Sequence, residues 1–219
     1  MGSVPGSLKR IMRGVSRRIE ALCKEGQFSR DYVEDIRYRK HRRLHSRMLG
    51  ILSSVGHDLG YMVDIERGLK PNEGSAFNPD ILLWKNNEPI LLLEYESTNS
   101  SDYRVIEKDL ANFKISAESL LEDCSLPRFW VVLTTLPDKS VTSWSNWEGY
   151  SAKEYERIKE NPRKFYKRWF IQEFSKVPNK LFNRSKLFLF NLNERGIELV
   201  FPSTRRRTIY PVRWNRFPD

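Results

Sequence analysis

Apolar residues recur at helical spacing through the first part of the chain. Ile11, Val15 and Ile19 fall on one stripe with arginines off it, which predicts an amphipathic helix from Leu8 onward. Gly26 is expected to end this helix, because glycine favours the left-handed conformation found just beyond helix C-termini. The sequence therefore predicts a packed helix that starts at Leu8, after a short flexible segment at residues 1–7.

A second helix is predicted over residues 31–56, with Ser29 as a candidate N-cap. Its middle is densely basic, which suits either phosphate contact or a solvated face. His41 and His45 lie four residues apart, but no second cluster completes a metal site, so we expect them to pack or to bond a phosphate. The candidate buried stripe consists of Tyr38, His41, Leu44, His45, Met48 and Leu52.

The apolar pattern then changes to the two-residue period of strands. Residues 61–66 alternate, with Asp64 and Glu66 on one face. After a loop at 67–77 come two apolar runs, 81–84 and 90–93, separated by a polar turn at 85–88 that Pro89 closes. This pattern predicts a hairpin, and the unbroken leucines of its second strand indicate that both faces are covered.

A helix and a further strand follow the hairpin. Ser101 or Asp102 is the candidate cap of a helix ending near Leu121, and residues 128–136 read as a buried strand. A helical crossover joins parallel strands, so the sequence predicts a mixed α/β sheet. The packed side of the helix is predicted to contain Val105, Leu110, Phe113, Ala117 and Leu120.

The C-terminal third is predicted to add helices and a hairpin to this sheet. Two helices are expected over 151–176, broken at Asn161–Pro162, and a hairpin pairs 186–190 with 196–201. Nothing marks a strong boundary, so one domain is expected. It comprises basic N-terminal helices (about 8–55), a core (about 58–136) and a basic C-terminal elaboration (about 150–219).

Charge is divided unevenly along the 219 residues. Residues 1–50 carry a net charge of +8, residues 51–150 carry −8 and residues 151–219 carry +10. Two basic arms around an acidic centre suit a polyanion such as DNA, although solvated surface charge is the plainer alternative. The candidate DNA contacts are Arg37, Lys40, Arg43, Arg47, Lys164, Lys167, Arg205, Arg206 and Arg207.

Composition narrows the class of protein further. No run reaches the roughly 18 apolar residues of a membrane span, so a membrane is not an expected partner. Cys23 and Cys124 lack metal-type spacing and are expected to be reduced thiols of a cytoplasmic protein. Zinc is therefore not an expected cofactor.

Three carboxylates stand at the ends of the hairpin strands. Asp80 precedes the first apolar run, and Glu94 and Glu96 follow the second; these glutamates share a face, with Tyr95 on the other. The hairpin is expected to bring all three acids together. Charges at the rim of a buried sheet are costly unless compensated, and Mg²⁺ prefers oxygen ligands. We therefore predict a Mg²⁺ site in preference to a surface hairpin with solvated acids.

Pro79–Asp80, a spacer and then Glu94-x-Glu96 resemble the signature of the PD-(D/E)xK nuclease superfamily. The form is the E-x-E variant of BamHI-type type II restriction endonucleases, and residues 94–101 resemble their active-site strand and turn. The resemblance implies a restriction-endonuclease-like mixed central sheet flanked by helices. It also implies Mg²⁺-dependent hydrolysis of double-stranded DNA by a homodimer acting on a palindrome.

The same resemblance implies roles for individual residues. Asp80, Glu94 and the main-chain carbonyl of Tyr95 would bind metal, and Glu96 would orient the attacking water where most members carry lysine. Glu66 is a possible further ligand. Lys108 and Lys114 are alternative sources of the missing positive charge. A repair or junction-resolving nuclease and a non-catalytic nucleic-acid-binding protein remain alternative functions.

Overall fold

The computed structural model describes residues 4–38, 43–69, 77–97, 105–123, 125–135, 185–202 and 208–214, and residues 160, 161, 164, 168 and 172 singly. The helices are α1 (Gly6–Lys24), α2 (Gln27–Tyr38), α3 (Arg43–Asp58) and α4 (Val105–Asp123). The strands are β1 (Met62–Ile65), β2 (Ile81–Lys85), β3 (Glu88–Ser97), β4 (Phe129–Thr135), β5 (Lys186–Asn193), β6 (Gly196–Phe201) and β7 (Ile209–Pro211).

All seven strands form one mixed sheet in chain order, β1 to β7. The β3–β4 and β4–β5 pairs are parallel, and the other four pairs are antiparallel. The crossover between β3 and β4 contains α4, so the predicted mixed α/β sheet and its parallel pair are confirmed. The predicted C-terminal hairpin is also confirmed, as β5 and β6.

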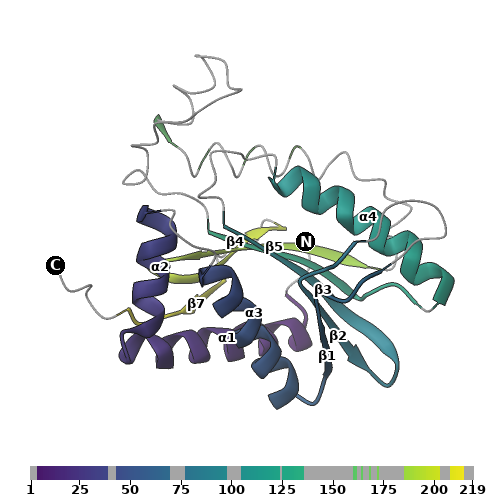
Figure 1. The fold of residues 1–219 in the computed structure, drawn as a ribbon, viewed down its shortest axis with the longest axis horizontal. Coiled ribbons are helices and arrows are strands. Elements are labelled where there is room, and N and C mark those ends of the chain that lie inside the picture. The colour runs from purple at the N-terminus through teal and green to yellow at the C-terminus, as the bar shows by residue number, and fades with distance from the viewer. Residues whose placement is uncertain are drawn as a thin grey trace.

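Helices cover both faces of the sheet (Figure 1). Alternate β3 residues divide between two apolar clusters: Leu91, Leu93 and Tyr95 pack with α1 and α3, whereas Leu92 packs with α4. This double coverage is what the leucine run indicated. On α4 the predicted packed positions Leu110, Phe113, Ala117 and Leu120 are all buried.

The N-terminal helices pack against strands from the far end of the chain. Ser16 Oγ of α1 donates a hydrogen bond of 2.7 Å to the carbonyl oxygen of Pro211 in β7. The Trp214 ring lies against α2, with its centroid 4.7 Å from that of Tyr32 and 5.5 Å from that of Phe28. The N-terminal helices and the last strand therefore share one apolar core.

The prediction of one helix over residues 31–56 is wrong. The chain forms α2 and α3 instead, which pack on each other and on α1. The like charges of the basic stretch at i, i+3 and i+4 disfavour a continuous helix there. Ser29 is not an N-cap, because α2 begins at Gln27, directly after the left-handed Gly26 (φ +73°).

The hairpin turn is shorter than predicted. Only Asn86 (φ 52°) and Asn87 (φ 62°) form it, and Glu88 already belongs to β3, paired with Lys85. Asparagine tolerates the left-handed conformation that such a two-residue turn requires at both positions. The resulting register sets which β3 side chains face α4.

Several predicted segments lie outside the described residues, including 70–76, 98–104, 136–159 and 203–207. Within 151–176, residues 160, 164, 168 and 172 are helical, and Asn161 Oδ1 accepts a hydrogen bond of 3.1 Å from the Lys164 backbone N–H. That bond has the form of a helix N-cap at the predicted break. No helix in the described part of the chain is long and apolar enough to cross a membrane.

Candidate carboxylate site between the hairpin and α4

The β2–β3 pairing places Asp80 beside Glu94. Ile81 pairs with Leu93, so Asp80, one residue earlier, lies opposite Glu94, one residue later. The Tyr95 backbone N–H donates a hydrogen bond of 2.7 Å to Asp80 Oδ2. The first two acids of the motif are therefore adjacent, as the hairpin pattern indicated.

Both of these carboxylates are buried. Asp80 is 9 % exposed and Glu94 is 5 % exposed. Burial raises the pKa of Glu94 well above its usual value, and the charges of Asp80, Asp109 and Glu96 raise it further, partly offset by a hydrogen bond from the Asp80 backbone. Among the described residues, Glu94 Oε1 has no hydrogen-bond partner. One buried oxygen is thus left for a ligand.

His45 of α3 contacts the site from the opposite layer. Its Nε2 atom lies 3.2 Å from Asp80 Oδ1, and its ring centroid is 5.9 Å from that of Tyr95. The hydrogen bond with Asp80 raises the pKa of His45, against the effect of burial; the charges of Asp80, Glu96 and Glu66 raise it further. The sequence predicted that His45 packs or bonds a phosphate, but not that it bonds Asp80, because their contact spans 35 residues.

Asp109 of α4 is an acid that the sequence reading missed. It is 1 % exposed, and its Oδ2 atom has no hydrogen-bond partner among the described residues. Burial raises its pKa well above the usual value, and the charges of Glu96 and Asp80 raise it further, partly offset by Lys108. The available signal was spacing: Asp109 lies one helical turn before Phe113 on the packed side of α4.

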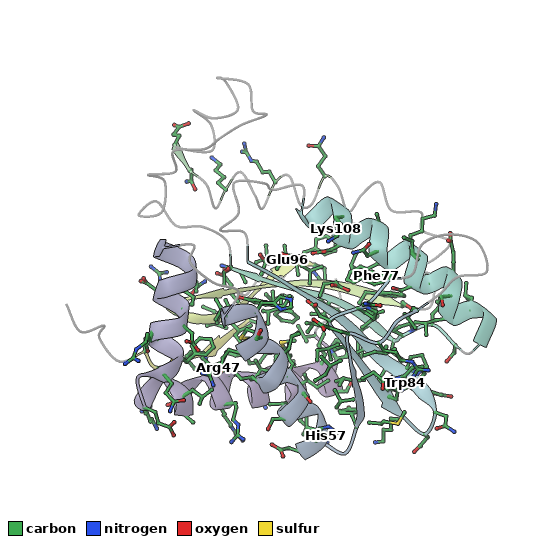
Figure 2. All side chains as sticks on the ribbon, in the orientation of Figure 1. Arg47, His57, Phe77, Trp84, Glu96 and Lys108 are labelled. Atoms are coloured by element: carbon green, nitrogen blue, oxygen red, sulfur yellow. The ribbon has the colours of Figure 1, made fainter. Side chains whose placement is uncertain are left out.

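Glu96 and Glu66 border the buried pair. Glu96 is half-buried, and its β3 position is in register with Thr134 of β4. Figure 2 labels Glu96 on the sheet beneath α4 and Lys108 on that helix. Glu66 has an exposed side chain, and its backbone N–H donates a hydrogen bond of 3.2 Å to the Asp80 carbonyl oxygen. Both acids are therefore near Asp80, but only Glu96 is partly covered.

The donor set fits a hard divalent cation. Across the described residues, no three His, Cys, Asp or Glu side chains already form a metal-binding group. The two Asp80 oxygens take part in hydrogen bonds with His45 and Tyr95, and each keeps a second lone pair. The unpaired Glu94 oxygen and the mutual repulsion of the acids are what a cation would relieve.

The candidate DNA contacts are only partly described. Arg47 Nε forms an ion pair of 2.9 Å with Asp31 Oδ2, which joins α3 to α2. Lys164 is exposed, as are Lys108 and Lys114. Arg37 and Arg43 lie in α2 and α3, but their side chains are outside the described residues, as are Lys40, Lys167, Arg205, Arg206 and Arg207 altogether.

No protein-family model, curated protein or solved structure matches this chain. Functional interpretation therefore depends on the geometry of the carboxylates and on the motif that they form.

Proposed function

We propose that this protein is a Mg²⁺-dependent endonuclease that hydrolyses phosphodiester bonds in double-stranded DNA. The observation that carries the proposal is the adjacency of two buried carboxylates, Asp80 and Glu94, with an unpaired oxygen on Glu94. Glu96 follows on the same face of the same strand. Acids that repel one another in a buried site are typical of sites for hard cations.

The element order is compatible with the PD-(D/E)xK resemblance. Helix α3 precedes β1, the motif acids lie directly before β2 and on β3, and α4 leads to the parallel strand β4. We accordingly propose the restriction-endonuclease-like fold for this part of the chain. A type II restriction enzyme acting as a cytoplasmic homodimer is the particular form that the motif favours.

Asp80, Glu94 and the Tyr95 carbonyl would hold Mg²⁺. When bound, this ion supplies charge stabilisation at the scissile phosphate and lowers the pKa of water. Glu96 orients a water molecule and accepts its proton, while His45 holds Asp80 in place through the Nε2···Oδ1 contact. The water oxygen would form a bond to phosphorus as the bond between phosphorus and the 3′ oxygen breaks. The 3′ oxygen would then take a proton from solvent, which leaves a 5′-phosphate and a 3′-hydroxyl.

The proposal is tested by incubating supercoiled plasmid with the protein in Mg²⁺ or in EDTA. We expect cleavage in Mg²⁺ alone, with sharp bands for a restriction enzyme and a smear for a nonspecific nuclease. Asp80→Asn and Glu94→Gln should abolish cleavage and retain DNA binding in a gel shift, because removing negative charge does not weaken phosphate attraction. Asp58→Asn, at an exposed acid that ends α3, should cleave normally.

Two other functions predict different results in the same assay. A non-catalytic nucleic-acid-binding protein is favoured by the glutamate at position 96 and by the engagement of both Asp80 oxygens. It would shift DNA in the gel and leave the plasmid intact in Mg²⁺. A repair or junction-resolving nuclease would cleave branched DNA and spare linear duplex.

A further inference from the structure

Asp109 occupies a place where a charged residue is unexpected. It is the fifth residue of α4, on the side that buries Phe113 and Ala117 against the sheet. Neighbouring strands present Leu82, Leu92 and Val132 to that side. Carboxylates are almost never fully buried without a partner, so this position requires a physical reason.

Helix capping does not supply that reason. An N-terminal carboxylate stabilises a helix by accepting from the first unpaired backbone N–H groups, which in α4 begin at Val105. Asp109 lies beyond the first four residues, where N–H groups are already bonded within the helix. Hydrogen bonding does not supply the reason either, because Asp109 Oδ2 has no hydrogen-bond partner among the described residues.

The nearby charges are mostly repulsive. Glu96, Asp80 and Glu94 each interact unfavourably with ionised Asp109, and Lys108 offsets only part of this. Glu94 Oε1 is a second buried oxygen in this cluster of acids that has no hydrogen-bond partner within the described part of the chain. Two unpaired buried oxygens, one from the sheet and one from the helix, thus occur within one set of mutually repelling acids.

We propose that Asp109 is a further carboxylate ligand of the divalent-cation site, supplied by α4 across from Asp80 and Glu94 on the sheet. This inference rests on the proposed function for the existence of the site. It adds a ligand from a separate layer of the fold, so that cation binding joins α4 to the β2–β3 hairpin. Oxygen-only coordination suits Mg²⁺ or Mn²⁺.

The test is the melting temperature of the full-length protein in EDTA and across a Mg²⁺ titration, with Mn²⁺ binding counted by electron paramagnetic resonance. Asp109→Asn should melt in EDTA at or above the wild-type temperature, because a repelling acid has been removed. Its half-saturating Mg²⁺ concentration should rise roughly 10–100-fold, a loss already typical of residues that only support a ligand. Glu94→Gln should raise that concentration similarly.

Asp31→Asn is the matched control. Asp31 is also a buried aspartate, but it is paired with Arg47 and is not among the groups that shift the pKa of Glu94 or Asp109. Its loss should lower the melting temperature and leave the Mg²⁺ dependence unchanged. If Asp109 had only a structural role, Asp109→Asn would also melt at a lower temperature with an unchanged Mg²⁺ dependence, or would fail to fold. Either result would overturn the inference.

The remaining outcomes separate this inference from the proposed nuclease function. A wild-type protein that neither binds Mn²⁺ nor gains stability from Mg²⁺ would overturn both. If the wild type and Asp109→Asn respond equally to Mg²⁺ while Glu94→Gln does not, the cation site stands and Asp109 is not in it. Cation binding that depends on Asp109, without DNA cleavage by the wild type, would support the ligand assignment and reject the nuclease.

Discussion

Glu96 follows Glu94 by two residues on β3 and is half-buried beneath α4. If its carboxylate accepts a proton from water, Glu96→Ala should lose roughly 10²–10⁴ in cleavage rate, the usual value of general-base assistance. DNA affinity should change little. Glu96→Lys should also be badly impaired, because the site has formed around an acid there. Single-turnover cleavage at saturating Mg²⁺ measures both, and near wild-type rates for Glu96→Ala would remove Glu96 from the reaction.

The pH dependence of stability is a second consequence of the buried acids. Glu94 and Asp109 have pKa values raised above 4.5 and 3.8 by burial, so the folded protein retains protons that the unfolded chain releases. Stability in EDTA should therefore fall as pH rises from about 4 through the folded pKa values. His45 acts in the same direction, because its pKa is raised above 6.5 and its contribution disappears at higher pH.

Urea unfolding in EDTA at about pH 5 and about pH 8 measures this dependence. The free energy of unfolding should decline less with pH in the double variant Glu94→Gln/Asp109→Asn than in the wild type. The difference between the two proteins is the contribution of these two acids. Added Mg²⁺ should restore wild-type stability at the higher pH and have less effect on the variant. An identical decline in both proteins would show that these carboxylates are not desolvated.

The sequence predicted the positions of some residues of the candidate site but not of others. Asp80, Glu94 and Glu96 were predictable because strand alternation and one short hairpin decide their relative positions. His45 and Asp109 were not, because helix packing across the sheet decides which turn of α3 or α4 meets Asp80. A charged residue on an otherwise apolar helix stripe was nevertheless a usable signal for Asp109.

At the scale of elements, the contact between α1 and α3 is tight at one glycine. A Cβ atom on Gly14 would lie 2.6 Å from Val55 Cγ1, whereas one on Gly50 would meet nothing within 4 Å. Gly14→Ala should destabilise the protein by about 0.5–2 kcal/mol, because overpacking outweighs the gain in helix propensity. Gly50→Ala should stabilise it by about 0.5–1 kcal/mol through helix propensity. Chemical denaturation measures both.

A double-variant cycle checks the cause of the Gly14 effect. Val55→Ala removes the atom that Gly14→Ala would meet, so the pair should be less destabilised than the sum of the two single variants. Strict additivity would mean that α1 shifts away from α3 at little energetic cost.

Element types were easier to predict than element boundaries. The leucine run of β3 and the α4 stripe each follow one period over many residues, so local pattern decides them. The packing of α2 on α3 instead includes an ion pair between Asp31 and Arg47, which no periodicity shows. The short strand β7 is three residues long and gave no pattern at all.

For the whole molecule, the two basic arms predict salt-sensitive DNA binding. Each phosphate contact should reduce affinity by nearly tenfold per decade of salt concentration, so several contacts give a steep slope. Fluorescence anisotropy with a labelled duplex at a series of NaCl concentrations measures the slope. A flat dependence would show that the +8 and +10 segments do not hold a polyanion.

The parallel β3–β4 pair was predictable from its helical crossover, but the position of β5 was not. Leu189 of β5 lies in register with Val132 of β4, and the connecting segment of the chain contains no strand pattern that specifies this neighbour. Long connections leave strand order to the packing of the complete sheet.

The hydrogen bond between Ser16 and Pro211 joins positions 195 residues apart. Ribosomes add about 5–20 residues per second, so α1 emerges about 10–40 s before the strand that it contacts. During that interval the apolar stripe of α1 lacks its C-terminal cover. A nascent chain stalled before β7 is therefore expected to expose this stripe and to depend on a chaperone to keep it from aggregating.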